Sequence, residues 1–260
     1  MFASLRRHYP VQVQTVGGIW SPPSQPKLVG LPLTSILARR SCQTADVDAR
    51  RQRLQGAHLY LVCDDRPDHF LAAALRGGVD IVQLRIKDGS DDEVLAAARR
   101  FRSACDAHDA LFILNDRPDL VRAADADGVH VGQDDAAVTQ ARELVGPDRL
   151  LGLSTHSPAQ IEAAADTDVD YIGVGPVHAT PTKPGRPAVG LELVRYAASN
   201  ACVPFFAIGG ISTANVKAVA AAGAERIAVV RALTEASDPQ RTAAELRSAV
   251  HRTGARVGSA

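Results

Sequence analysis

The stretch DIVQLRIKDGSDDEVLAAARRFRSACDAHDALFILN, residues 80–115, contains two short apolar runs with a longer amphipathic segment between them. The runs DIVQLR (80–85) and LFILN (111–115) are typical of buried β-strands. Residues 91–108 repeat apolar side chains at helical spacing and follow Ser90, a residue type that commonly caps helix N-termini. A strand, a helix and a second strand in this order predict one unit of a parallel sheet.

The same alternation continues in both directions along the chain. Further helical patterns occur at 157–165, 212–223 and 238–252, with Ser157 and Ser212 as expected N-caps and Gly223 as an expected stop. Eight strands with intervening helices predict an α/β protein, a (β/α)8 TIM barrel in a single domain. The alternative is an open, doubly wound sheet. The remaining predicted strands are LYLVC (59–63), GVHV (128–131), LLGLS (150–154), YIGVG (171–175), PFFAIG (204–209) and RIAVV (226–230).

The first 54 residues differ from the rest of the chain in composition. Residues 1–45 contain no acidic residue, and Ser, Thr, Pro and Gln separate the basic ones. We expect residues 1–54 to be a disordered or spurious N-terminal extension, with an organelle transit peptide as the alternative. The barrel is then expected over residues 55–253, followed by a flexible tail at 254–260.

The overall composition limits the classes of partner. Lys plus Arg and Asp plus Glu are equal at 29 each, so no global field favours nucleic acid or an anionic membrane. No apolar run approaches the ~20 residues that a membrane helix needs. The four cysteines are scattered without metal-type spacing, which indicates reduced thiols and a cytoplasmic location. Oligomeric state stays open, a homo-oligomer included.

Polar residues follow seven of the eight predicted strands, whereas the N-terminal ends show no comparable pattern. A barrel carries its site at the carboxyl ends of many strands, while an open sheet binds its ligand at one switch point. The distribution therefore favours the barrel.

In VQLRIK (82–87), alternate residues share one face of the strand. Gln83, Arg85 and Lys87 are expected to project into the barrel mouth, while Leu84 and Ile86 point to the helices. Inward cations need an anionic partner, because isolated buried charge is unfavourable. That partner is either a structural carboxylate or a bound diphosphate.

Two carboxylates, Asp116 in LNDRPD and Asp135 in VGQDD, end successive strands. They could form an acid/base pair, cap the following helices, or hold Mg²⁺, which prefers one or two carboxylates plus substrate phosphate oxygens. Asp134 competes with Asp135 for the same role. The histidines lack the regular spacing of a zinc site.

Two further segments are candidates for a second anion. AIGGIS at the end of the seventh strand and the start of VVRALTEA lie where barrels commonly bind phosphate. The proline-rich loop GPVHATPTKPGRP (175–187) is either a rigid surface connection or a support for Thr180, Thr182 and Lys183 over a ligand. Two anion sites suggest the joining of two phosphorylated molecules with diphosphate as leaving group.

Taken in order, VQLRIK, LNDR, HVGQDD, LSTH, GPVHATPTK, AIGGI and VVRAL resemble the thiamine-phosphate synthase family over residues 58 to about 250. The resemblance implies a (β/α)8 transferase that joins hydroxymethylpyrimidine diphosphate to a thiazole phosphate, which can be carboxylated. The products are thiamine phosphate and diphosphate, formed with Mg²⁺ after dissociative departure of the leaving group. The residues suit electrostatic rather than nucleophilic catalysis.

The resemblance also implies residue roles. Catalytic residues would be Arg85, Lys87, Ser154 and Lys183. The pyrimidine diphosphate would contact Gln83, Leu84, Arg85, Ile86, Lys87, Asn115, Ser154 and Lys183. The thiazole phosphate would contact Thr180, Pro181, Thr182, Gly210, Val230 and Arg231, and the metal Asp116 and Asp135.

One departure from the family pattern is Arg231, where the family commonly has Ser. Backbone N–H groups would tolerate this exchange, and a guanidinium could add a bidentate contact. The rival functions are a thiazole tautomerase on the same barrel, a non-catalytic barrel that binds thiamine precursors, and another phosphate-handling epimerase or aldolase.

Overall fold

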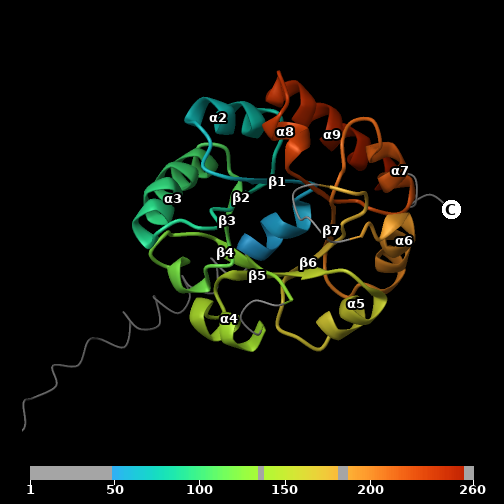
Figure 1. Ribbon diagram of the computed structural model, residues 1–260, viewed down its shortest axis with the longest axis horizontal. Helices are drawn as coiled ribbons and strands as arrows, with labels where there is room; N and C mark the ends of the chain where they lie inside the picture. The colour runs from blue at the N-terminus through green and yellow to red at the C-terminus, as the bar shows by residue number, and fades with distance from the viewer. Residues whose placement is uncertain (1–48, 134–137, 181–186, 255–260) are drawn as a thin grey trace, which may run out of the picture.

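The computed structural model describes residues 49–133, 138–180 and 187–254, which form a closed barrel of parallel strands (Figure 1). Each strand pairs with the next, and β1 pairs with β8 to close the ring. The predicted (β/α)8 barrel is therefore confirmed, and the open doubly wound sheet is wrong. The strands are β1 (Leu59–Cys63), β2 (Ile81–Leu84), β3 (Leu111–Asn115), β4 (Gly128–Val131), β5 (Leu150–Thr155), β6 (Tyr171–Val174), β7 (Phe205–Ile208) and β8 (Ile227–Val229).

Helices surround the strands in Figure 1, and only the connection between β3 and β4 lacks an α-helix in the described chain. That connection holds a single 3₁₀ turn, η1 (Pro118–Leu120). A short extra helix, α8, follows β8. The helices are α2 (Asp68–Arg76), α3 (Asp91–Asp106), α4 (Val138–Val145), α5 (Pro158–Ala164), α6 (Gly190–Asn200), α7 (Val216–Ala221), α8 (Arg231–Thr234) and α9 (Pro239–Gly254).

The helix ends test the predicted caps. Ser90 forms a capping box with Glu93, and the Ser157 side chain accepts a bond from the Gln160 N–H. Ser212 does not cap α7, because that helix begins later, at Val216. Its N–H instead donates to the Asn215 side chain in a tight turn. Gly223 ends the helical segment at φ 102°, a conformation that favours glycine.

The strands are apolar along their whole length because both faces are covered. Residues that face outward pack under the helices in one large cluster. Residues that face inward form a second cluster inside the barrel, which includes Tyr60, Ile113, Tyr171 and Phe206. Since successive side chains alternate between the two faces of a strand, the side chain of Gln83 on β2 faces inward, as that of Ile81 does, and it lines the cavity described below.

A helical segment over residues 49–56, the floor helix, lies across the end of the barrel where the strands begin (Figure 1). Leu54 is 2% exposed and packs with Ile81, Leu111 and Leu150, which start their strands. The predicted extension over residues 1–54 therefore ends too late, since residues 49–54 belong to the fold. The division for residues 1–48 and 255–260 lies outside the described residues.

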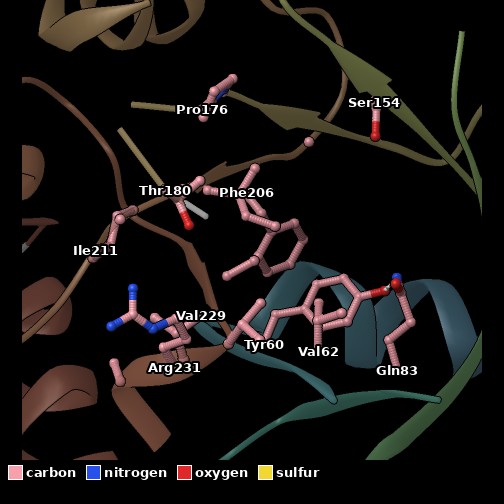
Figure 2. A pocket seen from close by; sticks show the side chains of 18 of the residues that line it. Tyr60, Val62, Gln83, Ser154, Pro176, Thr180, Phe206, Ile211, Val229 and Arg231 are labelled. Carbon is pink, nitrogen blue, oxygen red and sulfur yellow. Dashed lines mark hydrogen bonds between the residues drawn. The ribbon is translucent and has the colours of Figure 1, made fainter. Parts of the chain in front are cut away.

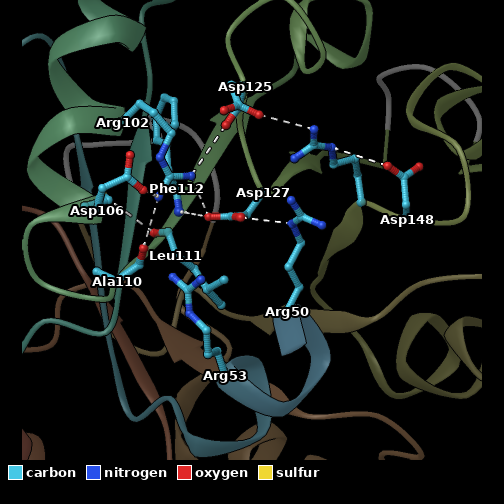
Figure 3. A network of polar contacts seen from close by, with 12 residues as sticks. Arg50, Arg53, Arg102, Asp106, Ala110, Leu111, Phe112, Asp125, Asp127 and Asp148 are labelled. Atoms are coloured by element: carbon cyan, nitrogen blue, oxygen red, sulfur yellow. Dashed lines mark hydrogen bonds and ion pairs between the residues drawn. The ribbon is translucent and has the colours of Figure 1, made fainter. Parts of the chain in front are cut away.

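The floor also carries a charge pattern that the sequence analysis overlooked. Asp80, Asp127 and Asp170 each precede a strand directly, and each accepts a backbone N–H from the preceding strand. Arginines form salt bridges with these aspartates: Arg50 and Arg102 pair with Asp127 at N–O distances of 3.0 and 2.8 Å (Figure 3). The prediction that the N-terminal strand ends are featureless is wrong.

Asp127 is the most connected of these aspartates. Burial by itself raises its pKa, but Arg102 and the Phe112 N–H outweigh burial, so the pKa of this carboxyl is lower than usual. Asp170 is held similarly by Arg51 at 2.8 Å and Arg142 at 2.7 Å. These contacts clamp the floor helix and the outer helices onto the strand starts.

Candidate active site

A cavity of about 320 Å³ opens at the carboxyl end of the barrel (Figure 2). Every strand contributes to its wall, which is consistent with a site built at the top of a (β/α)8 barrel. Several of the predicted site residues meet in this one wall: Gln83, Arg85, Asn115, Ser154, Thr180, Gly210, Val230 and Arg231.

Arg85 is half-buried in the wall. Within residues 49–133, 138–180 and 187–254, its guanidinium forms no salt bridge, so the structural carboxylate considered above is not found in the described chain. Arg231, in contrast, pairs with Glu235 at 2.8 Å, and both side chains are more than half exposed. The cavity wall thus offers one cation that is not paired with a carboxylate in the described structure and one that is.

Three of the predicted site residues in the VQLRIK segment do not line the cavity. Leu84 is buried in the outer cluster, and Ile86 packs against that cluster, as the alternation predicts. Lys87 is exposed and lies outside the cavity wall. Because β2 ends at Leu84, strand alternation no longer governs residue 87, and the contact of Lys87 with a diphosphate stays a prediction.

Asp116 follows β3 at the rim, exposed and at φ 56°, a left-handed conformation that Asp tolerates better than most residues. The Asn115 amide donates to its carboxylate, and its own N–H donates to the carbonyl of His130. Asp134 and Asp135 lie outside the described residues. No group of three or more potential metal-ligating side chains is found in the described part of the chain.

The donor set at this rim nevertheless fits Mg²⁺. This ion is commonly held by one or two carboxylates together with substrate phosphate oxygens, and it keeps several waters. Asp116 supplies one such carboxylate beside Asn115, which lines the cavity as Arg85 does. A dense protein cage is not required for this mode of binding.

Two glycines shape the wall after β7. Gly209 and Gly210 have φ 104° and 63°, and a Cβ on Gly209 would lie 2.5 Å from the Pro176 Cα. The chain can therefore turn closely against the loop after β6, and both residues line the cavity with their backbone. Thr180 reaches the wall from that loop. Pro181, Thr182 and Lys183 lie outside the described residues.

The base of the cavity is aromatic, which was not predicted. Phe206 meets Tyr60 and Tyr171 edge-on, at ring-centroid separations of 5.3 and 5.7 Å. Burial raises the pKa of both tyrosines, so their hydroxyls keep their protons. The available signal was strand parity, because Tyr60 and Tyr171 occupy inward positions of their strands.

His130 is a further residue of this wall that was not predicted from the sequence. It faces inward from β4, with Nε2 3.0 Å from the Ser154 Oγ and Nδ1 3.3 Å from the Tyr171 Oη. Sequence reasoning considered this histidine only as a metal ligand. Its strand position has the same inward parity as Asn115 and Ser154, and its register partners in the sheet are Asn115 on β3 and Gly152 on β5.

An arginine, hydroxyl groups and turn glycines over an aromatic base line this cavity, which places the chain among the (β/α)8-barrel proteins with a small-molecule-sized site at the carboxyl ends of their strands. The sequence profile described as thiamine monophosphate synthase matches residues 59–233. The chain belongs to this family. None of the helices within the described residues is long and apolar enough to span a bilayer.

Individual relatives agree with the family assignment. The chain is 53% identical over 205 residues to a thiamine-phosphate synthase of Thermobifida fusca, covering 76% of this chain and 94% of that protein. It is 52% identical over 196 residues to one of Gloeobacter violaceus, covering 75% of this chain. The match covers only 58% of that relative and 58% of another, from Thermosynechococcus vestitus.

The fold is also similar to that of a solved thiamine phosphate pyrophosphorylase from Pyrococcus furiosus. The TM-score is 0.71 at 32% sequence identity, and the match covers 78% of this chain and 98% of that one.

Proposed function

We propose that this protein couples 4-amino-5-hydroxymethyl-2-methylpyrimidine diphosphate to 4-methyl-5-(2-phosphoethyl)thiazole, producing thiamine phosphate and diphosphate. The observation that supports this function is the meeting of residues expected for both substrates in one cavity. The reaction needs both molecules side by side, and holding two reactants together contributes much of the rate acceleration in such reactions.

The pyrimidine diphosphate would lie toward β2, β3 and β5. Arg85 would neutralise its phosphates, because this half-buried guanidinium has no carboxylate partner in the described residues. Asn115 and Ser154 would contact the same molecule from neighbouring strands. Lys183 and Lys87 would approach from outside the described wall.

The thiazole phosphate would lie toward β7 and β8. Gly210 presents backbone to the cavity there, and Val230 and Arg231 follow β8 on the adjoining side. Thr180 supplies a hydroxyl from the loop after β6, with Pro181 and Thr182 next in sequence. This division leaves the aromatic base between the two anion sites, where the rings would meet.

Asp116 and Asp135 would hold Mg²⁺, which when bound would neutralise diphosphate charge. Asn115 would orient the Asp116 carboxylate through the amide bond already described. Arg85 would stabilise the negative charge of the departing diphosphate, and the cavity would exclude water from the reactive pyrimidine cation. No side chain needs to act as a covalent nucleophile.

The decisive experiment mixes the purified chain with both substrates and Mg²⁺ and measures diphosphate and thiamine phosphate together. We expect equal amounts of both products. Diphosphate release without thiamine phosphate would contradict the proposal, and binding of either substrate without turnover would indicate a precursor-binding barrel. Isomerisation of a thiazole substrate alone would indicate the tautomerase.

Asp116→Ala provides a second test of the metal assignment. Since Asp116 is exposed at the rim, the variant should fold normally while losing Mg²⁺-dependent turnover. A variant that keeps the full rate in limiting Mg²⁺ would contradict the role of Asp116.

A further inference from the structure

Five side chains form a continuous hydrogen-bonded chain along the base of the cavity. Gln83 Nε2 donates to Tyr60 Oη at 2.6 Å, and Tyr60 Oη lies 3.0 Å from Tyr171 Oη. His130 Nδ1 lies 3.3 Å from that hydroxyl, and its Nε2 lies 3.0 Å from Ser154 Oγ. The chain thus connects β2, β1, β6, β4 and β5 and ends at a cavity-lining hydroxyl. Figure 2 labels Gln83 and Tyr60 at one end of this chain and Ser154 at the other.

The first donor sets the direction of the whole chain. The Gln83 amide donates to Tyr60, so the single proton of Tyr60 is available to Tyr171. With the Tyr60 proton directed at Tyr171, the Tyr171 proton would in turn point to Nδ1 of His130. A neutral imidazole has one donor and one acceptor nitrogen, so Nε2 would then carry the proton and donate to Ser154.

The barrel interior is shaped to hold this imidazole in one orientation. A Cβ at Gly152 of β5 would lie 2.6 Å from His130 Nδ1 and 2.5 Å from Tyr171 Oη. A Cβ at Gly173 of β6 would lie 3.4 Å from His130 Cε1. The His130 and Tyr171 rings also pack together, with centroids 5.5 Å apart. Both glycines therefore leave the space that the imidazole and the phenol occupy.

The polarity of the chain has a consequence for Ser154, which is 9% exposed and lines the cavity. A serine hydroxyl that accepts a bond from Nε2–H has its own proton left for another partner. We propose that His130 is a positioning residue that holds Ser154 as a hydrogen-bond donor toward an unprotonated ring nitrogen of the substrate. The identity of that ligand as a pyrimidine rests on the proposed function, whereas the direction of the chain does not.

The tautomer of His130 tests the direction without any turnover. Long-range ¹H–¹⁵N correlation spectra of ligand-free, ¹⁵N-histidine-labelled protein report which nitrogen of each of the eight histidines carries the proton. The signals missing in His130→Gln assign that ring. We expect the Nε2–H form; an Nδ1–H form or an imidazolium would overturn the proposal.

Removing the Tyr171 hydroxyl from the middle of the hydrogen-bonded chain should leave the tautomer of His130 less constrained. In Tyr171→Phe the donor to Nδ1 is lost, so we expect the His130 signals to change toward a mixture of tautomers. Tyr196→Phe is the matched control, because the Tyr196 hydroxyl bonds Glu162 on the surface. An unchanged His130 tautomer in Tyr171→Phe would contradict the proposed direction of the hydrogen-bonded chain.

Ligand affinity distinguishes positioning from other roles of His130. An amide N–H can replace Nε2–H, so His130→Gln should keep the KM for pyrimidine diphosphate within about threefold, whereas His130→Ala should raise it about tenfold. An acid/base role would make the two variants equally defective in kcat. A merely structural role would lower both melting temperatures without separating the two KM values, and either result would overturn the proposal.

Calorimetric titration with pyrimidine diphosphate replaces KM if the wild-type protein shows no coupling. The expected Nε2–H tautomer without coupling would contradict the proposed function alone. Coupling with an Nδ1–H tautomer would contradict the positioning role alone.

Discussion

The two ends of this barrel use charged residues in opposite ways. At the floor, Asp127 lies between Arg50 and Arg102 and also accepts a backbone N–H, so its charge is fully compensated. At the mouth, Arg85 is half-buried without a carboxylate partner in the described residues, and Asp116 is exposed. Charge that is compensated within the protein stabilises the fold, whereas a half-buried cation such as Arg85, which has no carboxylate partner among the described residues, can take an anionic ligand.

This separation follows from the topology. Parallel strands send all their carboxyl ends to one side, so loops there can change for binding while the opposite end maintains the barrel. Substitutions at the floor should therefore change the free energy of unfolding, and substitutions at the mouth should change the kinetic constants.

Asp127→Ala should have the largest effect. Its removal leaves two poorly exposed arginines without their buried partner, so the free energy of unfolding should fall by roughly 3–5 kcal/mol. Urea denaturation measures this change, while kcat of the folded protein should stay near that of the wild type. Asp106→Ala is the control, because Asp106 pairs with the same Arg102 but is 65% exposed. Equal losses in the two variants would contradict the special role of the buried site.

Arg85→Ala should have the next largest effect, and on a different measurement. Loss of one preorganised cation facing the diphosphate should lower kcat/KM by about 10²–10³-fold. The free energy of unfolding should stay the same or rise slightly, since no ion pair in the described residues is broken. Arg99→Ala, on the exposed face of α3, is the control. A stability loss as large as that of Asp127→Ala would remove the distinction between the two ends.

Acid titration should sharpen the comparison further. The pKa of Asp127 is lower in the folded protein than the unfolded value of about 3.9, so the unfolded state binds its proton first. Its stabilising contribution is complete above that value and is lost as the pH falls through the folded pKa. The difference in unfolding free energy between wild type and Asp127→Asn should therefore shrink as the pH falls below about 4. A constant difference from neutral to acid pH would contradict this linkage.

Arg231→Ser should have the smallest effect. The pair with Glu235 is a solvent-exposed i,i+4 contact, so its loss should leave the free energy of unfolding nearly unchanged. The KM for the thiazole phosphate should change by no more than about threefold if backbone groups hold the phosphate. A rise well beyond tenfold would show that the guanidinium makes the main contact.

The sequence was sufficient for the barrel and for much of its mouth. Strand parity placed Gln83 and Leu84 on opposite faces correctly, whereas Lys87 lies beyond the strand end and outside the described cavity wall. The ion pairs at the floor were not predicted from the sequence, because aspartates that precede strands resemble ordinary loop residues. Their partners are distant in sequence: Arg50 and Asp127 are 77 residues apart.

By itself, the sequence determined the alternation of strands and helices, the closed parallel barrel and the family, since these depend on local periodicity and on motifs within single strands. Only the tertiary structure decided that Gln83, Tyr60, Tyr171, His130 and Ser154 form one chain, and that arginines of the floor helix reach aspartates of the sheet. The physical reason is that such contacts depend on strand register and closure around the barrel, which bring side chains from separate strands within hydrogen-bonding distance.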